Sequence, residues 1–271
     1  MKNKSLISVA VLLSMFLLES PELVSAESDL ANGGAAIEFS NTDTDTEIDD
    51  IRDPENPGVS VDPGDSPSTS GPLRIDFVPQ LNFHVNAISN ENVSYPVNAQ
   101  LFLDGKTEAR GNFVQISDYR KTAKGWQLQL RQDGQFRNPD TKNSVLNGAV
   151  LSFDKSWTNS VNKDSVTSPI VSKEIIRLEN IGDTYNLATA EEGDGTGTWS
   201  ISFGASADNP ADMISTLTPK VDKKGNPVLD SVFNNQQVHE NSAIRLSIPG
   251  KTEKDPVNYT TVLTWVLAEL P

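Results

Sequence analysis

The residues that could carry out chemistry are few and scattered in this 271-residue chain. There is no cysteine, so neither a thiol nucleophile nor a disulfide is available. The two histidines, His84 and His239, lie far apart and outside any serine, cysteine or metal-ligand motif. Two carboxylates could meet in space as in a glycosidase, but no spacing singles out a pair. The sequence therefore predicts no catalytic residue, metal or cofactor, and an enzyme is the least favoured class.

Two segments resemble ligand-binding loops in part. The glycine-rich segment 193–197 lacks the Gly-Lys-Ser/Thr ending of a phosphate-binding loop and precedes a strand pattern, so we expect a turn. The acidic run 43–49 has the opening spacing of a calcium loop. Ile48 and Pro54, however, stand where an EF-hand needs Gly and Glu. We interpret this run as a solvated acidic spacer rather than a calcium site.

Two Trp-x-Leu segments are the strongest candidates for a functional role. One begins Trp-Gln-Leu-Gln-Leu at residue 126, and the other lies in Leu-Thr-Trp-Val-Leu at residues 263–267. Because side chains alternate along a strand, Trp126 shares a face with Leu128. Trp265 shares a face with Leu267 for the same reason. The alternation favours a packed core, and an aromatic surface that binds sugar or a partner is the alternative.

The other two tryptophans are accessory candidates. Trp199 begins an alternating apolar face with Ile201 and Phe203, which again favours the core. Trp157 lies in the polar segment Lys-Ser-Trp-Thr-Asn, so we expect its ring to be partly exposed.

Short alternating segments separated by turn signals occupy the chain from residue 73 onward. This pattern predicts an all-β fold, an antiparallel β-sandwich or barrel-like single domain with long loops. Only residues 209–217 could form a short helical turn. The expected strands are 73–78, 81–85, 97–103, 113–116, 126–130, 149–153, 175–178, 198–203, 243–248 and 257–267.

The first 26 residues have the pattern of a secretory signal peptide. Lys2 and Lys4 precede an apolar stretch over 6–18, and Val-Ser-Ala at 24–26 offers a cleavage site. The stretch is too short to span a membrane, although an N-terminal anchor helix is the alternative reading. We expect export, cleavage after Ala26, and no membrane insertion afterwards.

Residues 27–71 are predicted to be a disordered acidic linker ahead of a domain at 72–271. Of the net charge of −15, residues 27–70 contribute −11, from twelve acidic residues and one arginine. Such a segment has too little apolar area to offset its ordering entropy. The folded part is only mildly acidic, which argues against nucleic acid, since phosphate binding requires a basic surface.

Ordered motifs accompany the two Trp-x-Leu segments. They lie at 72–79, 81–83, 118–120, 125–128, 146–149, 151–153, 195–204, 248–252, 259 and 263–271. On these motifs, residues 72–271 resemble the WxL-domain cell-surface proteins of low-GC Gram-positive bacteria. One departure is His84, where the family pattern has Gly after Phe, which leaves the geometry of the second strand in doubt.

The resemblance implies a secreted protein held non-covalently at the cell wall, with peptidoglycan as the ligand. It also implies partners, namely a membrane-anchored WxL-interacting surface protein and other surface proteins in adhesion complexes. No sortase signal follows Leu267, so we expect the fold to hold the chain at the wall. Two classes stay open. The first is a module that binds peptidoglycan directly. The second is a protein–protein interaction subunit held at the wall only through a partner surface protein.

Overall fold

The computed structural model describes residues 28–33 and 50–271, and within these ranges every regular element is a β-strand. The predicted all-β class is therefore confirmed. The predicted signal peptide and the acidic run 43–49 lie outside the described residues. In the part of the chain that is described, no helix is long and apolar enough to cross a membrane.

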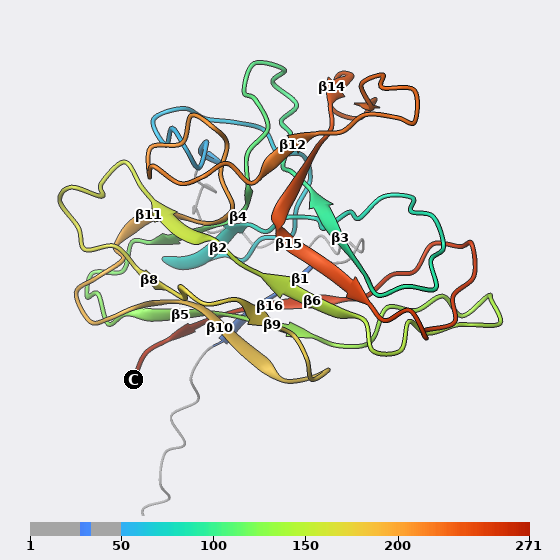
Figure 1. Ribbon diagram of the computed structural model, residues 1–271. Coiled ribbons are helices and arrows are strands. Elements are labelled where there is room, and N and C mark those ends of the chain that lie inside the picture. Colours follow the sequence, from blue (N-terminus) through green and yellow to red (C-terminus); the bar gives the residue numbers. More distant parts are fainter. Residues whose placement is uncertain (1–27, 34–49) are drawn as a thin grey trace, which may run out of the picture.

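The first sheet contains both Trp-x-Leu segments on neighbouring strands (Figure 1). Its order is β1 (Ser28–Gly33), β16 (Leu263–Glu269), β5 (Trp126–Gln132), β10 (Thr184–Ala190) and β8 (Ile170–Val171). β16 and β5 run antiparallel, with Leu267 opposite Leu128 and Trp265 opposite Leu130. The two motifs, separated by more than a hundred residues in sequence, thus lie side by side.

Two further antiparallel sheets complete the architecture. The second has the order β2 (Leu73–Phe77), β4 (Asn112–Asp118), β11 (Gly197–Phe203) and β7 (Ser156–Asn159). The third has the order β12 (Leu217–Pro219), β15 (His239–Ile248), β6 (Val150–Phe153) and β9 (Ile176–Arg177), and β3 (Val93–Asn98) also pairs with β15. A small hairpin, β13 (Leu229–Asp230) with β14 (Gln236–Gln237), projects from the body.

One hydrophobic core joins the three sheets. Each sheet contributes the apolar residues that alternate along its strands, for example Leu128 from the first, Ile201 from the second and Leu151 from the third. All three side chains are fully buried. Because burial of apolar area is the main favourable term in folding, the inward half of each alternating pattern fixes the register of its strand.

Two predicted elements are absent. Residues 81–85 form no strand, since His84 has a φ of +59°, a left-handed conformation incompatible with an extended chain. The resemblance predicts Gly at this position, and Gly is the residue that adopts positive φ without steric cost. Residues 209–217 form no helical turn, and the Asn209 side chain instead bonds the backbone of its own loop.

The prediction of a disordered linker is wrong for residues 50–71, which pack against the second sheet. Val61 is buried in a second cluster with Phe77, Phe102 and Phe113. The backbone N–H of Arg52 donates to the Gln115 side chain at 2.8 Å. This segment therefore lies across the outer face of β4.

Buried ion pairs explain why composition misled the linker prediction. The Arg110 guanidinium bonds both carboxylate oxygens of Asp53, at 2.9 and 3.0 Å. Glu55 accepts from the Ser206 backbone N–H at 2.7 Å. Both carboxylates are buried, so acidic residues that resemble a solvated spacer in sequence are partnered structural groups. Their partners are distant in sequence and could not be identified from a local window.

Candidate functional site

The four side chains of the two Trp-x-Leu motifs point into the core. Trp126, Leu128 and Trp265 are 0% exposed and Leu267 is 2% exposed. These four residues therefore lie in the core, which is the interpretation that the alternation favours. The aromatic rings therefore shape the fold and offer no surface to a ligand.

Trp126 is covered by the glycine loop at 193–197, which is the turn expected from its sequence. Its indole Nε1–H donates to the Gly195 carbonyl at 3.3 Å. Gly195 has a φ of +65°, and a Cβ there would lie 2.5 Å from the Ala190 Cβ. Gly125 is similarly constrained, because a Cβ would lie 2.4 Å from the Ala190 carbonyl oxygen. Because Gly125 and Gly195 have no Cβ, the backbone at these two positions can pack closely around Trp126 and Ala190.

Trp265 is held by packing alone. Its ring meets Phe153 edge to face, with centroids 6.5 Å apart and an interplanar angle of 87°. Its buried Nε1–H has no hydrogen-bond partner. A buried donor without a partner costs free energy, so the Trp265 side chain is stabilised only by the apolar contacts of its ring.

The accessory tryptophans are also buried. The Trp199 Nε1–H donates to the Thr196 carbonyl at 2.9 Å. Trp157 is only 6% exposed, and its Nε1–H donates to the Gly204 carbonyl at 2.9 Å. The predicted partial exposure of Trp157 is wrong because its polar neighbours are buried too. The Asn159 amide, for example, donates to the Pro54 carbonyl at 3.0 Å.

The opposite face of the same sheet is half-exposed, and it is polar on β5 and β10. Gln127 and Gln129 alternate outward between the buried residues of β5. Register pairing places Asn186 opposite Gln129 and Thr189 opposite Gln127 on β10. We call these four residues the amide face. They are the functional candidates that the motif analysis missed, although the period-two alternation of β5 already placed both glutamines outward.

Hydrogen bonding within the amide face is sparse. The Gln129 amide nitrogen donates to the Gln127 side-chain oxygen at 3.2 Å. The Asn186 and Thr189 side chains lie 2.8 Å apart. The Asn186 amide nitrogen donates to the Leu128 and Ala188 carbonyls, at 3.2 and 3.1 Å. Each glutamine amide offers two donor hydrogens and an oxygen with two lone pairs, so much of the capacity of Gln127 and Gln129 is turned to solvent. The face can thus bind a neutral ligand that presents both donors and acceptors.

Ion pairs flank the amide face and neutralise its cationic neighbours. At one end, Arg131 pairs with Asp133 at 2.7 Å. At the other end, Glu269 pairs with Arg120 at 2.8 Å and with Lys124 at 3.0 Å. The hydrogen bond from Lys124, followed by that from Arg120, holds the pKa of Glu269 below its usual value of 4.5. The sheet therefore presents little unpaired charge around its polar centre.

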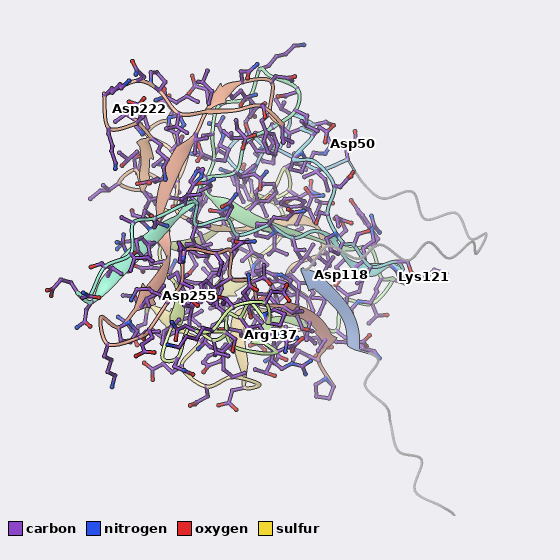
Figure 2. The ribbon with its side chains drawn as sticks, turned by 90° about the vertical axis from the view of Figure 1, so that its right-hand side faces the viewer. Asp50, Asp118, Lys121, Arg137, Asp222 and Asp255 are labelled. Atoms are coloured by element: carbon purple, nitrogen blue, oxygen red, sulfur yellow. The ribbon has the colours of Figure 1, made fainter. Side chains whose placement is uncertain are left out.

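Arg120 ties the two motifs together at their edge. Its guanidinium forms a two-point ion pair with Asp118, at 2.9 and 2.7 Å. It also donates to the Gly125 carbonyl at 3.0 Å, one residue before Trp126, and pairs with Glu269 two residues beyond Leu267. Figure 2 labels Asp118 on the side of the molecule that carries Lys121. This network positions the sheet edge and contains no group arranged for acid–base chemistry.

No group of three or more metal-ligating side chains occurs within residues 50–271. Together, the fold and the face define an all-β domain whose paired Trp-x-Leu strands support a neutral polar surface. The profile of a family described as WxL domain, surface cell wall-binding, matches residues 26–271, and the chain belongs to this family. No curated protein and no solved structure matches the chain.

Membership of this family defines the class of protein, and the extent of the match bears on the domain boundary. The protein is a surface protein that binds the cell wall, and its family is a binding family rather than an enzyme family. The match begins at residue 26, well before the predicted domain start at residue 72. That earlier start agrees with the packing of residues 50–71 onto the second sheet.

Proposed function

We propose that the chain binds peptidoglycan directly and non-covalently through the amide face. The observation that carries the proposal is the outward row of Gln127 and Gln129 on the strand whose inward residues are Trp126 and Leu128. The motif fixes the strand from inside, and the residues between the motif positions meet the solvent. A rigid sheet is a better platform for a binding surface than a loop.

The chemistry of the face matches this ligand. Peptidoglycan presents hydroxyl, acetamido and peptide amide groups, all of which pair with primary amides. Because the nearby cations are already paired with carboxylates, attraction to anionic wall polymers is a small contribution. Binding through the amide face should therefore persist at high salt.

The direct test is sedimentation with purified sacculi cleared of protein and teichoic acid. The double variant Gln127→Ala/Gln129→Ala should fold normally, since both side chains are half-exposed, and should bind more weakly. Two neutral hydrogen bonds at about 0.5–1.5 kcal/mol each correspond to a loss of roughly 5- to 150-fold. Gln80→Ala, at an exposed position outside every strand, is the matched control and should bind normally.

Two results would contradict the proposal. Normal binding by the folded double variant would exclude the amide face as the site. Failure of the wild-type chain to sediment, with its β-sheet circular dichroism intact, would exclude direct recognition.

The second candidate is an interaction subunit held at the wall by a partner surface protein and contributing to adhesion. One observation favours it: the segment 220–238 around β13 and β14 exposes apolar side chains on a projecting hairpin. Val221, Leu229 and Val232 are 54%, 55% and 69% exposed. Contiguous exposed apolar residues often mark protein contacts. Under this alternative, neither the wild type nor Leu229→Ser/Val232→Ser would bind bare sacculi, and only the wild type would be retained on cells.

A further inference from the structure

The outer edge of the second Trp-x-Leu strand is covered by a strand from the other end of the chain. β1 pairs antiparallel with β16 over six residue pairs, from Ser28 opposite Ala268 to Gly33 opposite Leu263. Figure 2 shows the blue ribbon of β1 at an outer edge of the molecule, with Asp50 labelled on the same side. Among the strands of residues 28–33 and 50–271, β1 pairs with β16 alone, so this single ladder holds it.

Without β1, β16 would be a seven-residue edge strand with a free row of N–H and C=O groups. Such an edge recruits another strand through backbone hydrogen bonds, whatever the donor's sequence. Its side chains raise no barrier, because Val266 and Ala268 face outward and carry no charge. The edge is thus an acceptor surface whose natural ligand is an extended segment.

The covering strand is poorly suited to permanent attachment. Its sequence, Ser-Asp-Leu-Ala-Asn-Gly, is rich in residue types with low strand propensity. Sixteen residues, 34–49, separate it from Asp50, where the packed chain resumes. A segment of that length can span roughly 55 Å when extended. The radius of gyration expected for the 222 residues of 50–271 is only about 17 Å. β1 can therefore reach the β16 edge of a neighbouring copy.

We propose that β1 exchanges between copies, so that Ser28–Gly33 of one chain completes the β16 edge of the next. This goes beyond the proposed wall binding, because the acceptor edge is the backbone side of β16 turned away from β5 and its glutamines, and it needs no wall ligand. Exchange re-forms the same six residue pairs and so costs no backbone contact. Chains crowded on a wall have a high effective concentration, which favours exchange over closure within one chain.

The absence of cysteine allows a clean test by disulfide trapping. Leu30 and Val266 are directly opposite in the ladder, and facing Cα atoms in such a pair lie about 4.5–5.5 Å apart, within disulfide range. Two single variants of the exported chain, Leu30→Cys and Val266→Cys, are mixed at high concentration, incubated and mildly oxidised. The product is resolved on a non-reducing gel. Leu30→Cys mixed with Val262→Cys, exposed and outside the ladder, is the matched control for random collision.

A covalent dimer from the first mixture, several-fold more abundant than in the control, is the expected result. Two outcomes would overturn the proposal. They are equal dimer yields in both mixtures, and no dimer in the first mixture even though the double variant Leu30→Cys/Val266→Cys forms an intrachain disulfide. The Gln127→Ala/Gln129→Ala double substitution should leave the yield of the disulfide-trapped dimer unchanged. Failure of wall binding and failure of strand exchange are therefore distinguishable.

Discussion

Replacing Trp265 with Ala tests whether the second motif acts only through the fold. The indole is fully buried, and truncations of buried tryptophan cost about 3–5 kcal/mol. No hydrogen bond is lost, because Nε1–H has no partner. Trp126→Ala removes an equally buried ring and also leaves the Gly195 carbonyl without its donor, about 1 kcal/mol more. We therefore expect Trp126→Ala to be the more destabilised of the two.

The assay measures stability and binding on the same samples. Urea unfolding followed by circular dichroism gives the free energy of unfolding of each variant. Sedimentation with cleaned sacculi is then measured without denaturant. Domains are stable by about 5–15 kcal/mol, so a loss of 3–5 kcal/mol leaves a substantial folded population in all but the weakest case. Binding should fall only in proportion to the unfolded fraction.

One result would refute the reasoning outright. A Trp265→Ala variant that is more than nine-tenths folded and no longer binds would mean that the ring contacts the ligand, contrary to its burial. A destabilisation below about 1 kcal/mol would equally contradict the assignment of Trp265 to the core.

Three further perturbations test particular contacts. Gly195→Ala should lower the free energy of unfolding by about 1–3 kcal/mol more than Gly193→Ala, measured in urea, because both have positive φ but only Gly195 lacks room for a Cβ. His84→Gly should be more stable than His84→Ala by about 1 kcal/mol in the same assay, since both remove the imidazole and only Gly relieves the positive φ. The lowered pKa of Glu269 means that its contribution to stability is present above pH 4.5 and lost as the pH falls through the folded value. Acid titration of Glu269→Gln should therefore show a shallower loss of stability below pH 4.5 than the wild type, and an unchanged curve would contradict the ion pair with Lys124.

The sequence alone predicts which side chains of a strand point into the core. It does not predict which strands or loops pack beside and over that strand. Alternation placed Leu128 and Leu267 on buried faces because period two is a local property. It could not show that β5 and β16 are neighbours, since pairing partners are set by the three-dimensional arrangement. Similarly, the doubt about His84 came from a local motif, and the structure shows its cause as a positive φ.

Polar residues were the main source of error. Trp157 was expected near the surface because its neighbours are polar, and residues 50–71 were expected to be disordered because they are acidic. In both cases the polar groups are buried with partners distant in sequence, such as Asp53 with Arg110. Composition measures the cost of burying a polar group and cannot identify the partner that offsets it. The amide face shows the converse, since outward polar residues such as Gln127 and Gln129 occur on any solvated strand and do not by themselves indicate a binding site.

The position of β16 in the sequence also sets an order of folding. β16 lies between β5 and β1 in its sheet, yet it comprises residues 263–269 of 271. A chain synthesised from its N-terminus would keep the edge of β5 open, and would leave β1 without its ladder, until those residues emerged. Such long-range pairing slows folding and leaves apolar surface exposed in the meantime. Completion of the first sheet is therefore a late event in folding. Loss of residues 263–271 would remove β16, the strand that joins β1 to β5.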